Sequence, residues 1–312
     1  MIQLFNVPKY KIDTSKFSSL LHDKVVTEFE QQFAEYVGAK YAVSVNSATN
    51  AIYLLMLLEK DNLIGIPSIL PPVVANAIIN AGKDICFFDN VSWVGESYVL
   101  HKKSKYQIID SAQKVKKNQY VDESKSDKDI IFFSFYPTKP VGSCDGGMIV
   151  SNNPEKIEKI RTLTFNGMSF AKNNWERVQT TIGHKMYMNS IQAYIASENL
   201  KKLEIKQQKL GKIREIYNKE FGLNNTSDHL YRVHVKDNSS TIKKAQEMGI
   251  MCGIHYHALH NNKVFKKAAS WSGLLTNSQI EHTQAMSIPF HENLTKKEIA
   301  TVTEFVKKVI IA

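Results

Sequence analysis

Apolar residues along the chain alternate between helical and strand-like spacing, which predicts an α/β protein. An amphipathic helix is expected over Lys24–Gly38, with apolar residues every four positions from Phe29 and a capping box of Thr27 and Glu30. Because the strand-like runs are apolar throughout, we expect an open sheet covered by helices on both faces. The predicted strands are 41–45, 63–66, 84–88, 107–110, 130–135 and 147–151, with helices at 50–58, 73–81 and 154–165.

The pattern changes after about Met188, which predicts a second, smaller α+β domain. A long helical stretch runs to about Phe221. Strands are expected at 231–235 and 253–256, and helices at 239–248 and 296–310. We therefore divide the chain into a large domain of residues 1–204 and a small C-terminal domain of residues 205–312.

The charge of the chain first suggests an anionic partner. Lys and Arg number 40 against 30 Asp and Glu, a formal charge of +10, but only four of the basic residues are Arg. Base readout and phosphate forks favour Arg, so we do not expect a nucleic-acid partner. Three separated cysteines favour free thiols in a reducing cytoplasm. The chain has neither an N-terminal apolar region nor a long apolar run, so we expect a cytoplasmic protein without a membrane anchor.

Two polar segments follow predicted strands and are candidates for ligand binding. The segment from Asn46 to Thr49 precedes a helix, where backbone N–H groups and hydroxyls bind anions. Taken alone, however, the segment is better explained by plain N-capping by Ser47 or Thr49. Asp110 ends a buried strand, the edge at which open α/β sheets bind ligands. A carboxylate there pairs with a cationic ring nitrogen or caps a helix.

A lysine and a group of histidines are the remaining candidates. Lys139 leaves an apolar strand between prolines and glycines, so it is held and partly desolvated, as an amine nucleophile requires. His255, His257 and His260 resemble a metal site only loosely, and we expect no metal. Dinucleotide, P-loop and serine-esterase motifs do not occur.

The segments that carry a family resemblance are FEQQFAEYVGAKYAVSVNSATNAI, QIIDSAQ, FFSFYPTK, DGGMIVSNNPEKIEKIRTL, SIQAYIASENLKKL, GIHYHALH and MSIPFHENLT. In this order they resemble the DegT/DnrJ/EryC1/StrS family of nucleotide-sugar aminotransferases. The resemblance implies the pyridoxal-phosphate-dependent transferase fold type I, with a mixed, mostly parallel sheet flanked by helices. It also implies pyridoxal 5'-phosphate, converted to pyridoxamine 5'-phosphate during the cycle, and a homodimer with its active site at the interface.

The reaction that the resemblance implies is transfer of an amino group from glutamate to a keto group of a nucleotide-diphosphate sugar, for glycan or lipopolysaccharide biosynthesis. Lys139 would form the Schiff base with the cofactor and then move a proton as base and acid. Asp110 would pair with the pyridine nitrogen, and Gln113 would lie near the phenolic oxygen.

The resemblance also assigns the phosphate end of the cofactor and the substrate side. Ser134, Thr49 and the backbone at Ala48 would hold the phosphate. His255 and Tyr256 lie in a region that approaches the substrate in the family.

The chain departs from the family pattern in four places. Ala48 stands where the family has Gly, and Pro71 where an aromatic residue stacks on the cofactor ring. Lys185 stands where the neighbouring subunit often supplies an Asn to the phosphate. The stretch between Phe88 and Gln107 is too short for the usual strand and helix, so the large domain should lack one βα unit. These departures leave a second function open, a shortened, non-catalytic member that binds the cofactor or a nucleotide sugar as a regulator or partner subunit.

Overall fold

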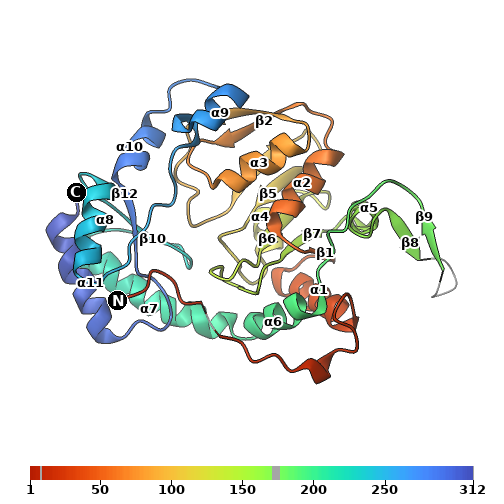
Figure 1. Cartoon of the computed structure of the whole chain (residues 1–312), viewed down its shortest axis with the longest axis horizontal. Helices are drawn as coiled ribbons and strands as arrows, with labels where there is room; N and C mark the ends of the chain where they lie inside the picture. Colours follow the sequence, from red (N-terminus) through yellow and green to blue (C-terminus); the bar gives the residue numbers. More distant parts are fainter. Residues whose placement is uncertain (8, 171–175, 312) are drawn as a thin grey trace.

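The computed structural model describes residues 1–7, 9–170 and 176–311 of the chain (Figure 1). A five-stranded sheet forms the centre of its larger part. Only β5 (Gln107–Asp110) and β6 (Ile130–Ser134) pair in parallel, and the other three pairs are antiparallel. The sheet is mixed as predicted, but the expectation of mostly parallel pairing is wrong for it. Its order is β1 (Tyr41–Val45), β7 (Gly147–Ser151), β6 (Ile130–Ser134), β5 (Gln107–Asp110) and β4 (Tyr98–Lys102).

Side chains alternate across this sheet between two hydrophobic cores. Phe132 and Ile108 contribute to one core, whereas their neighbours Phe133 and Ile109 contribute to the other. Helices cover both faces, as the unbroken apolar strands predicted. The first core also takes side chains from α2 (Ala48–Leu58), α3 (Pro72–Asn80) and α5 (Pro154–Thr164), and the second takes them from α1 (Lys24–Val37) and α6 (Ser190–Leu200).

Helix α1 begins one residue after its true cap, Asp23, whose side chain accepts from the N–H of Lys24. The predicted capping box is wrong. Thr27 donates its hydroxyl to the carbonyl of Lys24. The buried Glu30 carboxylate instead accepts from the N–H and hydroxyl of Ser44, each at 2.7 Å, and pairs with Arg161 at 2.8 Å. Glu30 therefore joins α1 to β1 and α5.

A second, wholly parallel sheet lies at the edge of the same part of the molecule. Its central strand is β3 (Asp84–Phe88), which pairs with β2 (Leu63–Pro67) on one side. On the other side it pairs with β11 (Ala269–Trp271), which comes from near the C-terminus. The C-terminal third of the chain therefore completes a sheet that the N-terminal third begins.

A third hydrophobic core lies in the C-terminal part, on the left of Figure 1. Strand β10 (Tyr231–His234) pairs there with β12 (Ala285–Ile288), antiparallel. The strand predicted at 253–256 is wrong, because that segment forms only an isolated bridge between Gly253 and Ser287. The long helical stretch is divided into α6 and α7. The helices that contribute to this core are α7 (Leu203–Phe221), α8 (Asn238–Glu247) and α11 (Lys296–Val309).

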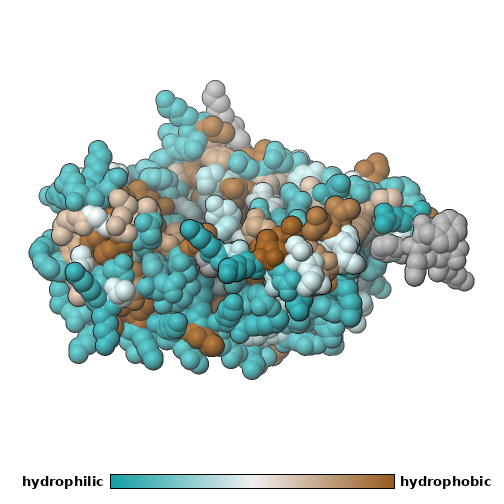
Figure 2. Space-filling model, turned by 60° about the horizontal axis from the view of Figure 1, so that its bottom comes forward, coloured by the Kyte–Doolittle hydropathy of each residue, from teal (hydrophilic) through white to brown (hydrophobic). Residues whose placement is uncertain are grey.

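The remaining elements are short and were not predicted. The antiparallel pair of β8 (Met168–Phe170) and β9 (Arg177–Gln179) projects to the right in Figure 1. The surface in Figure 2 is mainly hydrophilic, with scattered apolar side chains. Within the described ranges, no helix is long and apolar enough to cross a membrane. The short elements that the sequence did not predict are η1 (Thr14–Lys16), α4 (Gln119–Glu123), β8 (Met168–Phe170), β9 (Arg177–Gln179), η2 (Leu259–Asn261), α9 (Lys263–Ala268) and α10 (Thr276–Gln284).

Candidate active site

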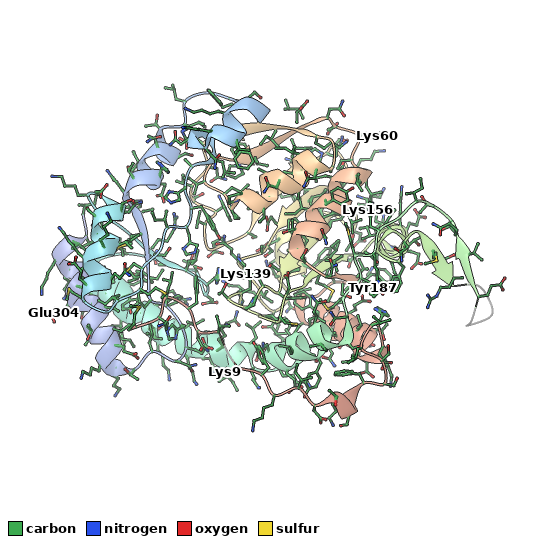
Figure 3. All side chains as sticks on the ribbon, viewed as in Figure 1. Lys9, Lys60, Lys139, Lys156, Tyr187 and Glu304 are labelled. Atoms are coloured by element: carbon green, nitrogen blue, oxygen red, sulfur yellow. The ribbon has the colours of Figure 1, made fainter. Side chains whose placement is uncertain are left out.

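One cavity of about 390 Å³ brings together most of the side chains that the sequence singled out. Its volume lies in the range of about 300–1,000 Å³ found for small-molecule sites. Figure 3 places Lys139 near the middle of the molecule, between the two large bodies of the fold. Eight of the ten predicted site residues line this cavity: Ala48, Thr49, Pro71, Asp110, Gln113, Ser134, Lys139 and Tyr256.

Lys139 follows β6 in a tight turn, in which its N–H donates to the carbonyl of Tyr136 at 2.9 Å. The turn directs the side chain into the cavity, where protein surrounds the ammonium group. Burial lowers the pKa of Lys139 to about 8, and the negative charge of Asp110 opposes this change. A large fraction of the amine is therefore neutral, and nucleophilic, slightly above neutral pH.

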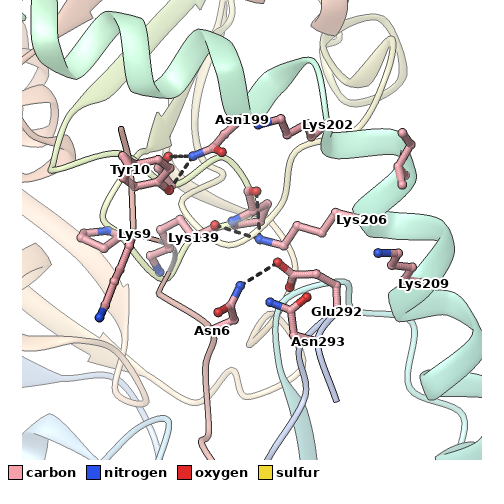
Figure 4. Close-up of a pocket in the computed structure, with 14 residues that line it drawn as sticks. Asn6, Lys9, Tyr10, Lys139, Asn199, Lys202, Lys206, Lys209, Glu292 and Asn293 are labelled. Carbon is pink, nitrogen blue, oxygen red and sulfur yellow. Dashed lines mark hydrogen bonds between the residues drawn. The ribbon is translucent and has the colours of Figure 1, made fainter. Parts of the chain in front are cut away.

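Residues of α6 and α7, which sequence reasoning missed, also hold the Lys139 turn in place (Figure 4). Lys206 of α7 donates its ammonium to the carbonyls of Lys139 at 3.4 Å and Pro140 at 3.2 Å. Asn199 of α6 donates to the carbonyl of Gly142 and to the hydroxyl of Tyr10. Nothing in the local sequence connects these helices to the turn, because the contacts depend on how α6 and α7 pack.

Asp110 lies at the end of β5 and is almost fully buried. The N–H of Ala112 donates to Oδ1 at 2.9 Å, and the hydroxyl of Tyr98 donates to Oδ2 at 3.0 Å. Burial raises the pKa of Asp110 to about 6, while these two bonds and the charge of Lys139 oppose the rise. No helix begins at Asp110, so its role is not that of a helix cap.

The opposite end of the cavity suits an anion. Ser47 caps α2 by accepting from the N–H of Asn50 at 3.2 Å, so N-capping is confirmed for this residue. The next two residues, Ala48 and Thr49, line the cavity, and first-turn N–H groups have no partner inside a helix. The positive end of the helix dipole and the Ser134 hydroxyl add to the attraction. Capping and anion binding are therefore compatible here.

The cavity has a third side, formed by Gln113 and aromatic rings. Gln113 donates to the hydroxyl of Tyr256 at 2.9 Å and accepts from the N–H of Gly95 at 2.7 Å. Trp93 lines the cavity and lies parallel to Tyr256, with ring centroids 6.2 Å apart. Sequence reasoning missed Trp93 and Tyr98. The only sequence signal for them was their aromatic character, in the stretch between Phe88 and Gln107 that we predicted to be too short for the usual strand and helix.

Two predicted residues lie outside the cavity lining. His255 lies next to it, where its Nδ1 and the hydroxyl of Ser287 are 2.9 Å apart. Burial, assisted by the charges of Lys139 and Arg232, lowers the pKa of His255 to about 4. Lys185 is exposed and bridges to Phe165, away from the cavity of its own chain. Its predicted contact was with a neighbouring subunit and stays a prediction. Among the described residues, no three His, Cys, Asp or Glu side chains are arranged to hold a metal ion.

Comparisons with known proteins show the family to which the chain belongs. The DegT/DnrJ/EryC1/StrS aminotransferase family matches residues 11–93 and 106–307. A UDP-4-amino-4,6-dideoxy-N-acetyl-beta-L-altrosamine transaminase of Campylobacter jejuni is 26% identical, over 98% of this chain and 95% of the relative. The spore coat polysaccharide biosynthesis protein SpsC of Bacillus subtilis is 25% identical, over 91% and 89%.

Solved structures show the same fold over nearly the whole chain. PseC of Helicobacter pylori, an aminotransferase involved in the biosynthesis of pseudoaminic acid, superposes with a TM-score of 0.79 at 20% identity, covering 98% of this chain and 99% of that one. A putative sugar aminotransferase of Streptococcus pneumoniae, solved in its PLP form, gives a TM-score of 0.78 at 17% identity, covering 97% of each chain. This likeness confirms the predicted α/β fold.

The relatives also carry segments that this chain lacks. The alignment with the Campylobacter protein extends over 364 positions, more than the 312 residues of the chain. The family match is interrupted between residues 93 and 106, inside the stretch that the sequence predicted to be short. In the structure this stretch holds β4 and no helix. That the absent part is one βα unit stays a prediction.

Proposed function

Because the chain belongs to the DegT/DnrJ/EryC1/StrS aminotransferase family, whose members depend on pyridoxal phosphate, we propose that it transfers an amino group from glutamate to a keto group of a nucleotide-linked sugar. The observation that carries the proposal is the buried pair of Lys139 and Asp110 in one cavity. An amine of lowered pKa beside a carboxylate that stays ionised above about pH 6 is what this chemistry requires.

The donors and acceptors of the cavity fit pyridoxal phosphate. The start of α2 at Ala48 and Thr49, with the Ser134 hydroxyl, would hold the phosphate. Asp110 would accept from the pyridine nitrogen, and Gln113 would donate to the phenolic oxygen. When bound, the cofactor supplies an electron sink for the negative charge that develops at the amino-acid α carbon.

Lys139 has two tasks in this proposal. Its neutral amine would hold the cofactor covalently, and the free Nζ would carry a proton to and from the substrate. A pKa of about 8 leaves enough of each protonation state for both directions at neutral pH. Apolar side chains of the same cavity lining, among them Ile52, Val74 and Phe132, would limit the access of water to the proton transfer.

A spectroscopic titration tests the proposal directly. Purified protein mixed with pyridoxal phosphate should develop a visible absorption band, glutamate should remove it, and 2-oxoglutarate should appear by mass spectrometry. Lys139→Ala should give no such band, while Lys60→Ala, at an exposed position, should keep it. A band that survives in Lys139→Ala would show that another amine reacts.

The shortened segment between residues 93 and 106 favours one alternative, a non-catalytic member that binds the cofactor or a nucleotide sugar as a regulator or partner subunit. Pro71, in place of an aromatic residue, points the same way. The same titration separates the two functions, because a non-catalytic protein would keep the band after glutamate is added.

The sugar, the nucleotide and the assembly are further proposals. We infer a homodimer in which Lys185 of one subunit meets the phosphate bound by the other, and a cytoplasmic role in glycan or lipopolysaccharide synthesis. A screen of keto nucleotide sugars with glutamate, read by product mass, would identify the substrate. The altrosamine transaminases among the relatives make UDP-linked 4-keto sugars the first set to test.

A further inference from the structure

The segment from Trp93 to Tyr98 forms a wall of the cavity, although most of it lies outside the family match. Three of its residues contact the site. Trp93 lines the cavity, Gly95 donates its N–H to Gln113, and Tyr98 donates its hydroxyl to Asp110. The stretch that makes this chain short is therefore part of the candidate active site.

The position of Tyr98 is fixed by the sheet. Strand β4 pairs antiparallel with β5 in a register that places Tyr98 directly opposite Asp110. The buried phenol donates to Oδ2 at 3.0 Å, while Ala112 donates to Oδ1. Each carboxylate oxygen then has one fixed donor and a remaining lone pair, so the plane of the carboxylate is set before any ligand binds.

The position of the Trp93 ring is also fixed by its contacts. Its indole N–H donates to the carbonyl of Ile69 at 3.0 Å, two residues before Pro71. Its ring is parallel to that of Tyr256 and has its centroid 4.6 Å from that of Tyr98. The indole is 5% exposed, so its remaining surface faces the cavity.

Residues of the C-terminal part of the chain also contact the segment from Trp93 to Tyr98. Ser227 donates its hydroxyl to the carbonyl of Gly95 at 2.8 Å. Glu96 accepts from Thr226 at 2.8 Å and pairs with Lys114 at 2.9 Å. These contacts connect the wall to the C-terminal part of the chain and to Lys114.

We propose that Tyr98 and Trp93 are positioning residues for the cofactor, with Tyr98 orienting the Asp110 carboxylate and Trp93 supplying the aromatic wall that Pro71 does not. This inference rests on the proposed function. Besides Tyr98 on β4, the titratable groups that face Asp110 are Lys139, after β6, and Tyr256, after the bridge at Gly253. A hydrogen bond to the ionised form keeps Asp110 charged in spite of its burial.

The role of Tyr98 is tested in the cofactor-free protein. The carboxyl carbon of Asp110, labelled with carbon-13 and assigned with Asp110→Asn, is titrated by NMR in wild type and Tyr98→Phe. We expect Tyr98→Phe to raise the pKa of Asp110 by about one pH unit, since one bond to a charged group is lost. Tyr106→Phe, which removes a phenol bonded to Glu59, is the matched control and should leave the titration unchanged. An unchanged midpoint in Tyr98→Phe overturns its role.

The role of Trp93 is tested by cofactor affinity, measured by equilibrium dialysis with pyridoxal phosphate. Trp93→Ala should weaken binding at least tenfold, Trp93→Phe should restore most of it, and Trp271→Ala, at a half-exposed position, should change nothing. If Trp93→Ala fails to fold, Trp93→Leu makes the same comparison with an apolar side chain. Equal affinity in all variants overturns the role of Trp93.

The two tests also separate this inference from the proposed function. If wild type binds no pyridoxal phosphate, the proposed function and the role of Trp93 both fail, while the NMR titration still decides whether Tyr98 orients Asp110. If wild type binds it and neither residue matters, the wall is only structural and the inference fails alone.

Discussion

Replacing Lys139 with Met should stabilise the cofactor-free protein, because the folded chain buries the Lys139 ammonium away from water. Burial lowers the pKa of Lys139 from 10.5 to about 8. At 1.36 kcal/mol per pH unit, the charged form costs the folded state about 3 kcal/mol at pH 7. Met has a similar length and no charge, so Lys139→Met should raise the free energy of unfolding by up to about 3 kcal/mol.

The pH dependence of this gain follows from the direction of the pKa change. Below pH 8 both the folded and the unfolded chain bind the Lys139 proton, so the cost is complete. Between about 8 and 10.5 only the unfolded chain binds it, and the stability of the wild type rises with pH. The advantage of Lys139→Met should therefore shrink across this window and vanish above it.

Urea denaturation of the cofactor-free protein at pH 7, 8, 9 and 10, at one protein concentration, measures the effect. Lys60→Met, at an exposed position far from Lys139 in Figure 3, should change stability by no more than about 0.5 kcal/mol. If Lys139→Met is no more stable than wild type at pH 7, the buried-charge explanation is refuted. It is also refuted if the stability advantage of Lys139→Met is as large at pH 10 as at pH 7.

Three further substitutions test other parts of the site. Asp110→Asn removes the charge that supports the Lys139 ammonium, so the pKa of Lys139 should fall below about 8. The pH dependence of Lys139 acylation measures this pKa, and an unchanged midpoint of that dependence would contradict the coupling between the two residues. Gly147→Ala would put a methyl 2.9 Å from the backbone nitrogen of Ala48, so calorimetry should show a loss of about 1–3 kcal/mol in stability, and inorganic phosphate should bind less well. Lys206→Met should speed amide exchange across residues 136–143 by removing the two bonds to the Lys139 turn, and unchanged exchange would mean that the turn needs no such support.

The main parts of the candidate site were predictable because they are local. Asp110 and Lys139 follow apolar strands, and the carboxyl ends of strands are where open sheets place ligands. The start of α2 was marked by Ser47, whose cap is a short-range contact. Each of these features needs only a strand, a turn and the next few residues.

The rest of the site depends on long-range pairing, which local pattern does not contain. Tyr98 reaches Asp110 only because β4 joins the sheet antiparallel, and the stretch carried no clear strand signal. Lys206 reaches the Lys139 turn from a helix 67 residues later in the chain. The pairing of β10 with β12 is long-range as well, and the sequence predicted a strand at 253–256 but none at 285–288.

The parallel sheet of β2, β3 and β11 has a consequence for synthesis of the protein. Strand β11 begins about 180 residues after β3 ends, so one edge of β3 lacks its partner until those residues have left the ribosome. At 5–20 residues per second this takes roughly 10–35 s. During that time the nascent chain presents an open strand edge of the kind that recruits other chains. Products that stop before residue 269 should therefore depend on chaperones or aggregate, even though every predicted catalytic residue is already present in them.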